Sequence, residues 1–177
     1  LADDLFAEAF GLSIEAARKA LKKLFGTGGE YDPDRTEAFI RSMCRRRAEM
    51  VNQTTQAEII KALAEGLDED AMQSTPEGVF ENAKENRADS AGAAFAGALI
   101  GWTLLETCRQ NERPGKNIFK TWVVTSDNPR ASHAAMNGET VPYDEPFSNG
   151  AMWPGDIDNL SIEDVARCEC VLEITIL

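Results

Sequence analysis

The chain has 177 residues, 43% of them hydrophobic, and a formal net charge of −12 with an isoelectric point near 4.5. This apolar content excludes a disordered chain, and the length suits one domain or a helical domain with a small appendage. The acidic balance disfavours nucleic acid as the primary partner, because such a surface repels phosphate backbones at long range.

The chain begins at Leu1, not at a methionine, and shows no charged-then-apolar leader with a cleavage site. We therefore expect a segment of a longer or processed protein that carries no secretion signal. The longest apolar run, residues 91–105, is shorter than the ~20 residues of a membrane-spanning helix. Its Gly and Ala content favours a buried helix, and no membrane partner is expected. The four cysteines do not suggest a disulfide framework, so reduced thiols in the cytoplasm are expected.

Helical patterns begin at the N-terminus. A short amphipathic piece over residues 3–10 is followed by a second helix that Ser13 is expected to cap, and Gly26-Thr-Gly-Gly29 ends it. A long helical pattern covers residues 35–64. The polar residues 52–56 in its middle predict either one uninterrupted helix or a kink.

The second half of the helical part is predicted to contain another long helix. Residues 66–70 read as a connector, residues 74–77 as the start of a shorter helix with a proline in its first turn, and residues 87–109 as the long helix. Small residues in this helix would let another helix approach closely, and we expect that neighbour to be the helix over 35–64. The glycines concerned are Gly92, Gly97 and Gly101.

The remaining residues read as short strands and turns. Residues 119–125 are rich in β-branched and aromatic side chains and predict a strand, and Asn137-Gly138 predicts the tight turn of a hairpin. Residues 168–176 predict a closing strand. The fold class is therefore α+β: a mostly helical N-terminal part, residues 1–115, is followed by a small β-rich C-terminal unit, residues 116–177.

Rare residue types occur in a defined order within the β-rich unit. A Lys-x-Trp strand is followed by Arg-x-Ser-His, a glycine, a later phenylalanine, Pro-Gly-Asp and a terminal Cys-x-Cys-x-Leu. The residues are Lys120, Trp122, Arg130, Ser132, His133, Gly138, Phe147, Pro154, Gly155, Asp156, Cys168, Cys170 and Leu172. In order and spacing, these motif residues resemble the phage head morphogenesis family, similar to the protein F of phage Mu. The resemblance covers residues 36–174, with its specific motifs in 116–174.

The resemblance implies a structural, non-catalytic role as a minor head protein of a tailed bacteriophage. The implied partners are the portal protein or the major capsid protein, with self-association also open. The implied location is the virion, in the capsid interior near the portal, after assembly in the host cytoplasm, and some relatives are linked to DNA delivery. One departure is Arg167-Cys-Glu-Cys170, where the family often has Asn-Cys-Arg-Cys.

The histidine and the paired cysteines permit two interpretations. Cys168 and Cys170 alternate in the closing strand, so both sulfurs would face one side, and His133 could join them in a tetrahedral zinc site. The fourth ligand would come from Asp127, Asp156 or Cys108. Alternatively, both thiols are buried packing groups and His133 is hydrogen-bonded to the backbone. The packing interpretation is favoured, because zinc ribbons usually have Cys-x2-Cys spacing, and no cofactor is assigned.

Arg130 and His133 could also form an anion-binding or general acid-base pair. No Ser/Asp/His order and no phosphate-binding glycine loop accompanies them, so no catalytic residue is assigned. We expect instead that Arg130 binds carbonyl groups of residues 142–156 and that His133 pins the hairpin. Trp122 and Trp153 are expected in the core. The enzymatic alternative is a metal- or Arg/His-dependent effector delivered with phage DNA.

An arginine cluster lies within the helix predicted over residues 35–64. It consists of Arg41, Arg45, Arg46 and Arg47. These side chains could contact packaged DNA or an acidic partner, or form a solvated face paired with acidic neighbours such as Glu37 and Glu49. If the cluster binds a partner, a portal or capsid surface fits better than DNA.

Overall fold

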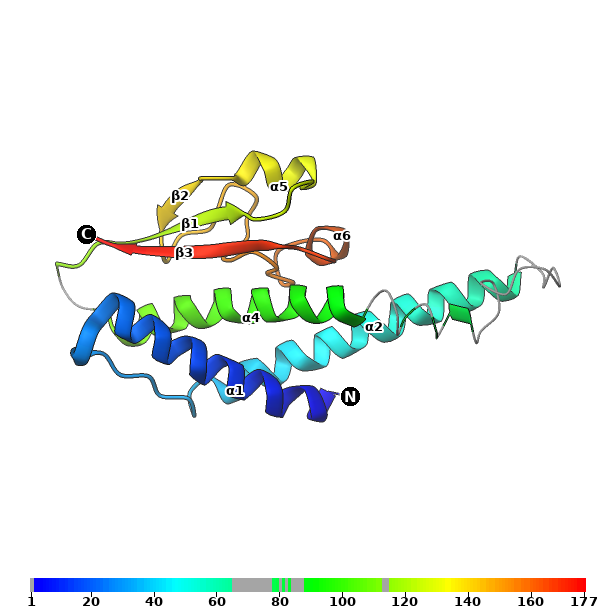
Figure 1. Cartoon of the computed structure of the whole chain (residues 1–177), viewed down its shortest axis with the longest axis horizontal. Helices are drawn as coiled ribbons and strands as arrows, with labels where there is room; N and C mark the ends of the chain where they lie inside the picture. The colour runs from blue at the N-terminus through cyan, green and yellow to red at the C-terminus, as the bar shows by residue number, and fades with distance from the viewer. Residues whose placement is uncertain (1, 65–77, 80, 82, 84–87, 113–114) are drawn as a thin grey trace.

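The computed structural model describes residues 2–64, 78–79, 81, 83, 88–112 and 115–177 (Figure 1). The expectations for residues 66–70 and 74–77 lie outside these described residues. Long helices come first along the chain, and a small three-stranded antiparallel sheet with short helices follows. The predicted α+β class is confirmed.

Helix α1 spans Ala2–Ala20 and continues into a π-helical turn, η1, at Leu21–Phe25 and a 3-10 turn, η2, at Gly26–Gly28. The prediction of two helices with Ser13 as a cap is wrong. Ser13 lies inside α1 and is 1% exposed. Its hydroxyl oxygen is 3.0 Å from those of both Tyr31 and Thr103, so it bonds to other segments and not to a helix N-terminus.

Helix α2 spans Glu37–Ala64 without interruption, so the first of the two alternatives for this segment is present. The hydroxyl groups of Thr54 and Thr55 donate to the carbonyl oxygens of Met50 and Val51, at 2.9 Å each. These hydroxyl groups bond to carbonyl groups one turn earlier in the same helix, which is compatible with helical backbone, so the polar stretch does not end the helix.

Helix α4, Ala88–Gln110, forms the middle layer of the molecule. In Figure 1 the sheet lies on one side of α4 and helices α1 and α2 lie on the other. Phe39 of α2 stacks on Trp102 of α4 with ring centroids 4.3 Å apart. Among the described residues, α4 is the one helix long and apolar enough to cross a membrane, and more than half of its apolar window is buried inside the molecule.

Gly97 and Gly101 of α4 face the β-rich unit, and a Cβ on Gly92 would meet nothing within 4 Å, so the prediction that these glycines admit the helix over 35–64 is wrong. A Cβ on Gly101 would lie 3.4 Å from the Cβ of Trp153, and the nearest neighbour of Gly97 is the carbonyl oxygen of Cys170. Where α2 and α4 meet, the stacked rings of Phe39 and Trp102 lie between them. The close approach therefore occurs on the opposite side of α4, where the sheet packs.

The sheet has the order β2-β1-β3, with both pairs antiparallel. Strand β1 is Ile118–Val124, β2 is Thr140–Pro142 and β3 is Cys170–Ile176. The strands predicted over 119–125 and 168–176 are confirmed, except that Thr125 lies just after β1 and Cys168 and Glu169 lie just before β3. Lys120 on the central strand is paired with Val141 on one side and Ile174 on the other.

The Asn137-Gly138 turn exists, but it joins a helix to a strand and not two strands. Helix α5 spans Ala131–Met136 and comes directly before it. Asn137 has φ −59° and ψ 121°, Gly138 has φ 83°, and the N–H of Glu139 donates to the carbonyl of Met136 at 2.9 Å. These are the features of a type II turn, whose third position favours glycine.

Candidate functional site

The thirteen motif residues come together in the β-rich unit, and most of them are buried. Ten of the thirteen have buried side chains or backbone, and the exceptions are Arg130, Ser132 and Gly138. Trp122 is fully buried, with its ring edge-to-face against Phe147 at 5.3 Å between centroids. Both Trp122 and Trp153 lie in the core, as the sequence predicted.

Lys120 is a buried cation on the central strand. Its side chain is 0% exposed, and Nζ donates to the carbonyl oxygen of Met152 at 2.8 Å. Nζ also lies 4.9 Å from the centroid of the Phe147 ring, a cation-π contact. Burial, and secondarily the nearby charge of Arg109, lowers the pKa of Lys120 to about 8. Lys120 therefore remains mostly protonated at pH 7 and fastens a loop to the sheet.

Asp156 organises that same loop as a buried acceptor. Its carboxylate accepts from the N–H of Met152 at 2.9 Å, from the N–H of Asp158 at 3.1 Å and from the amide of Asn159 at 2.8 Å. The preceding Gly155 has φ 81°, and a Cβ there would lie 2.7 Å from the Cβ of Ala98 on α4. The Pro-Gly-Asp motif thus shapes a loop that contacts the helical part closely.

The Arg-x-Ser-His motif binds helix α6, which spans Ile162–Val165. Arg130 donates to the carbonyl oxygen of Ala166, and the hydroxyl of Ser132 donates to Asp164 at 3.1 Å. Arg130 does bind a carbonyl, but the expectation that the carbonyl belongs to residues 142–156 is wrong. The end of α6 lies beside the start of α5, and its last turn leaves carbonyl groups without partners in the helix.

His133 connects α5 to the two cysteines. Its Nδ1 lies 3.3 Å from Sγ of Cys170 and 3.8 Å from Sγ of Cys168, and its ring packs edge-to-face on Trp122 at 5.9 Å. The other nitrogen, Nε2, faces Oδ1 of Asp164 at 3.8 Å. The expectation that His133 bonds the backbone is wrong, because Nδ1 contacts the thiols at and just before the start of β3 and Nε2 has no hydrogen-bond partner among the described residues. The expectation that it pins a hairpin is wrong as well, because the Asn137-Gly138 turn joins α5 to β2.

The ionisation of these groups follows from burial and from their contacts. Burial lowers the pKa of His133, and the neighbouring Arg130 lowers it further, so the ring is neutral at pH 7. The hydrogen bond between the thiols lowers the pKa of Cys168 to about 7 and raises that of Cys170. Cys168 is thus the more acidic of the two thiols, beside a neutral imidazole.

The three side chains that the sequence suggested as zinc ligands are brought together. The donor atoms of His133, Cys168 and Cys170 all lie within 4.8 Å of one another, and all three residues are buried. None of the proposed fourth ligands joins them: Asp127 is exposed, Asp156 is bound within its own loop, and Cys108 is buried in α4..

Sequence reasoning missed Asp164, which the structure places beside His133. Its backbone N–H donates to the hydroxyl of Ser161, the N-cap of α6, at 3.2 Å, and its carboxylate accepts from that hydroxyl at 2.9 Å. A Ser-x-x-Asp pattern is a known helix start, so Ser161 and Asp164 carried a usable signal. What the sequence could not show is that this short helix ends beside His133.

Three arginines of the α2 cluster bond to other residues of the chain, and the fourth is exposed on the surface. Arg41 pairs with Glu37 at 2.9 Å, as one alternative expected, and Arg46 pairs with Asp158 of the β-rich unit. Arg47 donates to the carbonyl of Ala91 on α4. Arg45 is exposed and makes no hydrogen bond or ion pair with the described residues.

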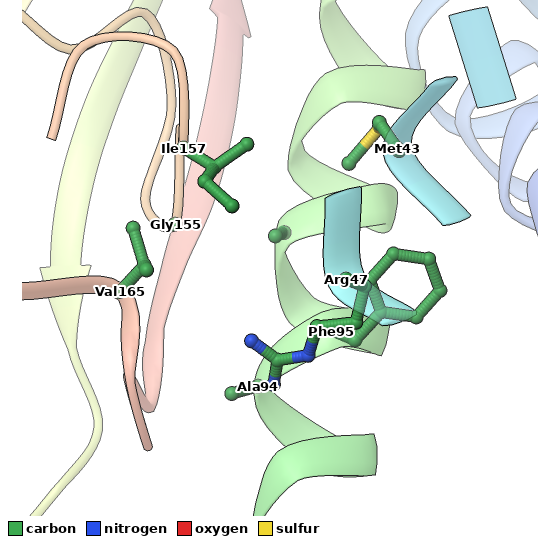
Figure 2. Close-up of a pocket in the computed structure, with 8 residues that line it drawn as sticks. Met43, Arg47, Ala94, Phe95, Gly155, Ile157 and Val165 are labelled. Carbon is green, nitrogen blue, oxygen red and sulfur yellow. The ribbon is translucent and has the colours of Figure 1, made fainter. Parts of the chain in front are cut away.

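Two cavities border the interface between the helical part and the β-rich unit. Figure 2 shows the smaller one, where Ile157 and Val165 extend toward α4 opposite Phe95 and Arg47. Its volume is about 20 Å³, which is enough for one water molecule. The larger is a mostly apolar groove of about 530 Å³ between α2, the start of α4 and the end of α6. Neither cavity is lined by Arg130 or His133.

Comparisons of the chain with models of known protein families, with curated proteins and with solved structures find no match. The functional inference therefore depends on the residues and their geometry. The arrangement can hold loops against a sheet and can offer sulfur and nitrogen ligands to a metal ion.

Proposed function

We propose that the chain is a minor head protein of a tailed bacteriophage, with a structural role in head assembly and in association with the portal or the capsid interior. One observation carries the proposal: the motif residues are used to fasten loops and helix ends to the sheet. Lys120 fastens the Met152 loop, Asp156 shapes it, and Arg130 fastens the end of α6. Such residues are required by the fold itself, which agrees with the structural role that the resemblance implies.

The contacts of Arg130 and His133 favour this role over catalysis. A general acid-base group must reach the proton of a bound substrate. His133 is only 4% exposed, with sulfur atoms at one ring nitrogen and a carboxylate near the other. Arg130 is exposed but donates to a carbonyl of its own chain.

The surface charge favours a protein partner over DNA. The chain carries a net charge of −12, and three of the four clustered arginines bind within the chain. Arg45 is the arginine of the cluster that is exposed without such a bond among the described residues. It is therefore the side chain of the cluster that is best placed for an acidic patch on a portal or capsid surface.

The test uses the full chain, co-expressed with the portal protein and the major capsid protein encoded in the same genome. Complexes are separated by sedimentation, and we expect the chain to co-sediment with the portal ring or with assembled shells. Arg45→Glu should weaken this association about tenfold, and Lys116→Glu, the same charge reversal at an exposed residue of the β-rich unit, should leave it unchanged.

Three outcomes would overturn the proposal. Failure to bind either assembly would remove it directly. Turnover of a small substrate that is lost in Arg130→Ala but not in Arg45→Glu would favour the effector enzyme. Retention of DNA that falls steeply with salt and depends on Arg45 would instead favour a DNA-binding internal protein.

A further inference from the structure

Three potential metal ligands converge where α5 meets the start of β3. A zinc ion binds thiolate sulfur at about 2.3 Å and imidazole nitrogen at about 2.0–2.1 Å, so a sulfur and a nitrogen at neighbouring corners of its tetrahedron lie about 3.6 Å apart. Nδ1 of His133 lies 3.3 Å from Sγ of Cys170 and 3.8 Å from Sγ of Cys168. Both nitrogen–sulfur separations are thus close to the value for one zinc ion, and all three donor atoms lie within 4.8 Å of one another.

The second nitrogen of the imidazole supports the same interpretation. A ligating histidine usually donates its other N–H to a carboxylate, which fixes the ring and its tautomer. Nε2 of His133 is buried, has no hydrogen-bond partner among the described residues, and faces Oδ1 of Asp164 at 3.8 Å. Asp164 is itself held by the hydroxyl groups of Ser132 and Ser161. With a metal bound at Nδ1, the proton of the neutral ring is on Nε2, beside this carboxylate.

The surroundings separate these donors from bulk water. The ring of Trp122 packs against His133, and the ring of Phe147 packs against Trp122. Cys168 and Cys170 are 6% and 4% exposed. An apolar shell of this kind strengthens the attraction between a divalent cation and two thiolates.

We propose that His133, Cys168 and Cys170 bind one zinc ion, with a water molecule as the fourth ligand. Each thiol loses its proton on binding, and the neutral imidazole binds through Nδ1. The ion joins α5 to β3 across more than thirty residues of chain, and Asp164 positions the histidine. Two sulfur ligands with one imidazole favour zinc over magnesium or calcium, which prefer oxygen. The site does not depend on the proposed function.

The chain contains its own matched controls, because two of its four buried cysteines lie outside the cluster. The full chain is purified without a histidine tag, under reducing conditions and after growth with added zinc, and its metal content is measured by mass spectrometry. We expect about one zinc per chain in the wild type and in Cys44→Ser and Cys108→Ser. Cys168→Ser and Cys170→Ser should contain less than about a tenth of that amount.

Two further measurements test the proposal even if the cysteine variants fail to fold. Exchange of the wild type into cobalt should produce the visible and thiolate-to-cobalt absorption of a tetrahedral site. A strong chelator should lower the Tm of the wild type by about 5 °C or more and leave any folded Cys170→Ser unchanged.

Three results would overturn the proposal. The first is a wild-type chain that contains no zinc and takes up no cobalt while its thiols are reduced. The second is equal loss of zinc in Cys44→Ser, which would place the metal elsewhere. The third is a Cys168–Cys170 disulfide in the freshly isolated chain, detected as a mass lower by two hydrogen atoms.

Discussion

Two pairs of buried polar residues, one in the helical part and one in the β-rich unit, bond in different ways. In the helical part, Ser13 and Thr103 bury neutral hydroxyl groups that bond to each other at 3.0 Å. In the β-rich unit, Lys120 and Asp156 bury charged groups that bond to the backbone of a loop. The Ser13–Thr103 bond joins two side chains. The bonds of Lys120 and Asp156 instead supply hydrogen-bond partners to backbone groups of a loop that has no helix or strand to pair them.

The difference follows from how each region satisfies its backbone. A helix pairs its own N–H and C=O groups, so its side chains need mainly to pack. The loop from Met152 to Leu160 has few such internal pairs, so particular side chains must supply them. The β-rich unit should therefore tolerate fewer substitutions than the helical part, although the two share one hydrophobic core.

Removal of the Asp156 carboxylate should have the largest effect. Asp156→Ala leaves three donors of the loop without their acceptor, and it removes a negative charge close to Lys120, so we expect a loss of about 3 kcal/mol in the free energy of unfolding. The helical counterpart, Ser13→Ala with Thr103→Val, removes both partners of a neutral pair and leaves only the half-buried hydroxyl of Tyr31 without its partner, so it should cost about 1 kcal/mol. Urea denaturation measures both, and equal losses would contradict the contrast.

The second prediction concerns two glycines with the same backbone conformation. Gly155 and Gly150 have φ 81° and 86°, so an alanine at either position is strained by about 1–2 kcal/mol. Only at Gly155 would the new Cβ also meet Ala98, at 2.7 Å, whereas nothing lies within 4 Å of one at Gly150. Gly155→Ala should therefore lose about 2 kcal/mol more than Gly150→Ala. If the two variants unfold at the same urea concentration, the contact with α4 is not tight.

The third prediction uses the pKa of Lys120, which is about 8 in the fold against 10.5 for a free lysine. Between these values the unfolded chain binds more protons, so the free energy of unfolding should rise with pH. From pH 7.5 to 9.5 the rise from this group is about 1–2 kcal/mol. Lys120→Met should lack it.

Lys116→Met, at an exposed position, provides the control and should behave as the wild type does. Urea denaturation at the two pH values measures all three proteins. A rise of the same size in Lys120→Met would show that Lys120 is not the group responsible.

The smallest effect is expected where the two regions meet at the surface. Arg46 of α2 pairs with Asp158, and both side chains are 39% exposed, so solvent screens the pair. A double-mutant cycle with Arg46→Ala and Asp158→Ala should give a coupling below about 1 kcal/mol that decreases with added salt. A coupling of several kcal/mol at high salt would mean that the pair is more important to the interface than its exposure indicates.

The sequence predicted the elements well where a regular pattern extends over many residues. The helix over 87–109 and the strand over 119–125 are present because apolar periodicity and β-branched side chains report directly on local structure. Ser13 was misjudged because its hydroxyl bonds to residues far along the chain. Gly101 was misjudged because a small residue shows that something approaches, but not which element does.

The sequence was enough to predict which residues form the candidate site, but not how they are arranged in space. His133, Cys168 and Cys170 are rare residue types, so composition alone drew attention to them. Their meeting depends on α5 and the start of β3 lying side by side, which is a tertiary contact. The role of Asp164 depends on the position of a four-residue helix, which sequence patterns do not specify.

The central place of α4 has a consequence for how the molecule opens. Both broad faces of this helix are covered, one by the sheet and the other by α1 and α2. Neither layer can detach without exposing the apolar side chains that α4 shares with it. The amide hydrogens at the middle of α4, around Leu99 and Thr103, should therefore exchange with solvent only when the whole molecule unfolds. A substitution that destabilises the sheet should therefore speed amide exchange in the middle of α4 as well, because it increases the population of the globally unfolded state.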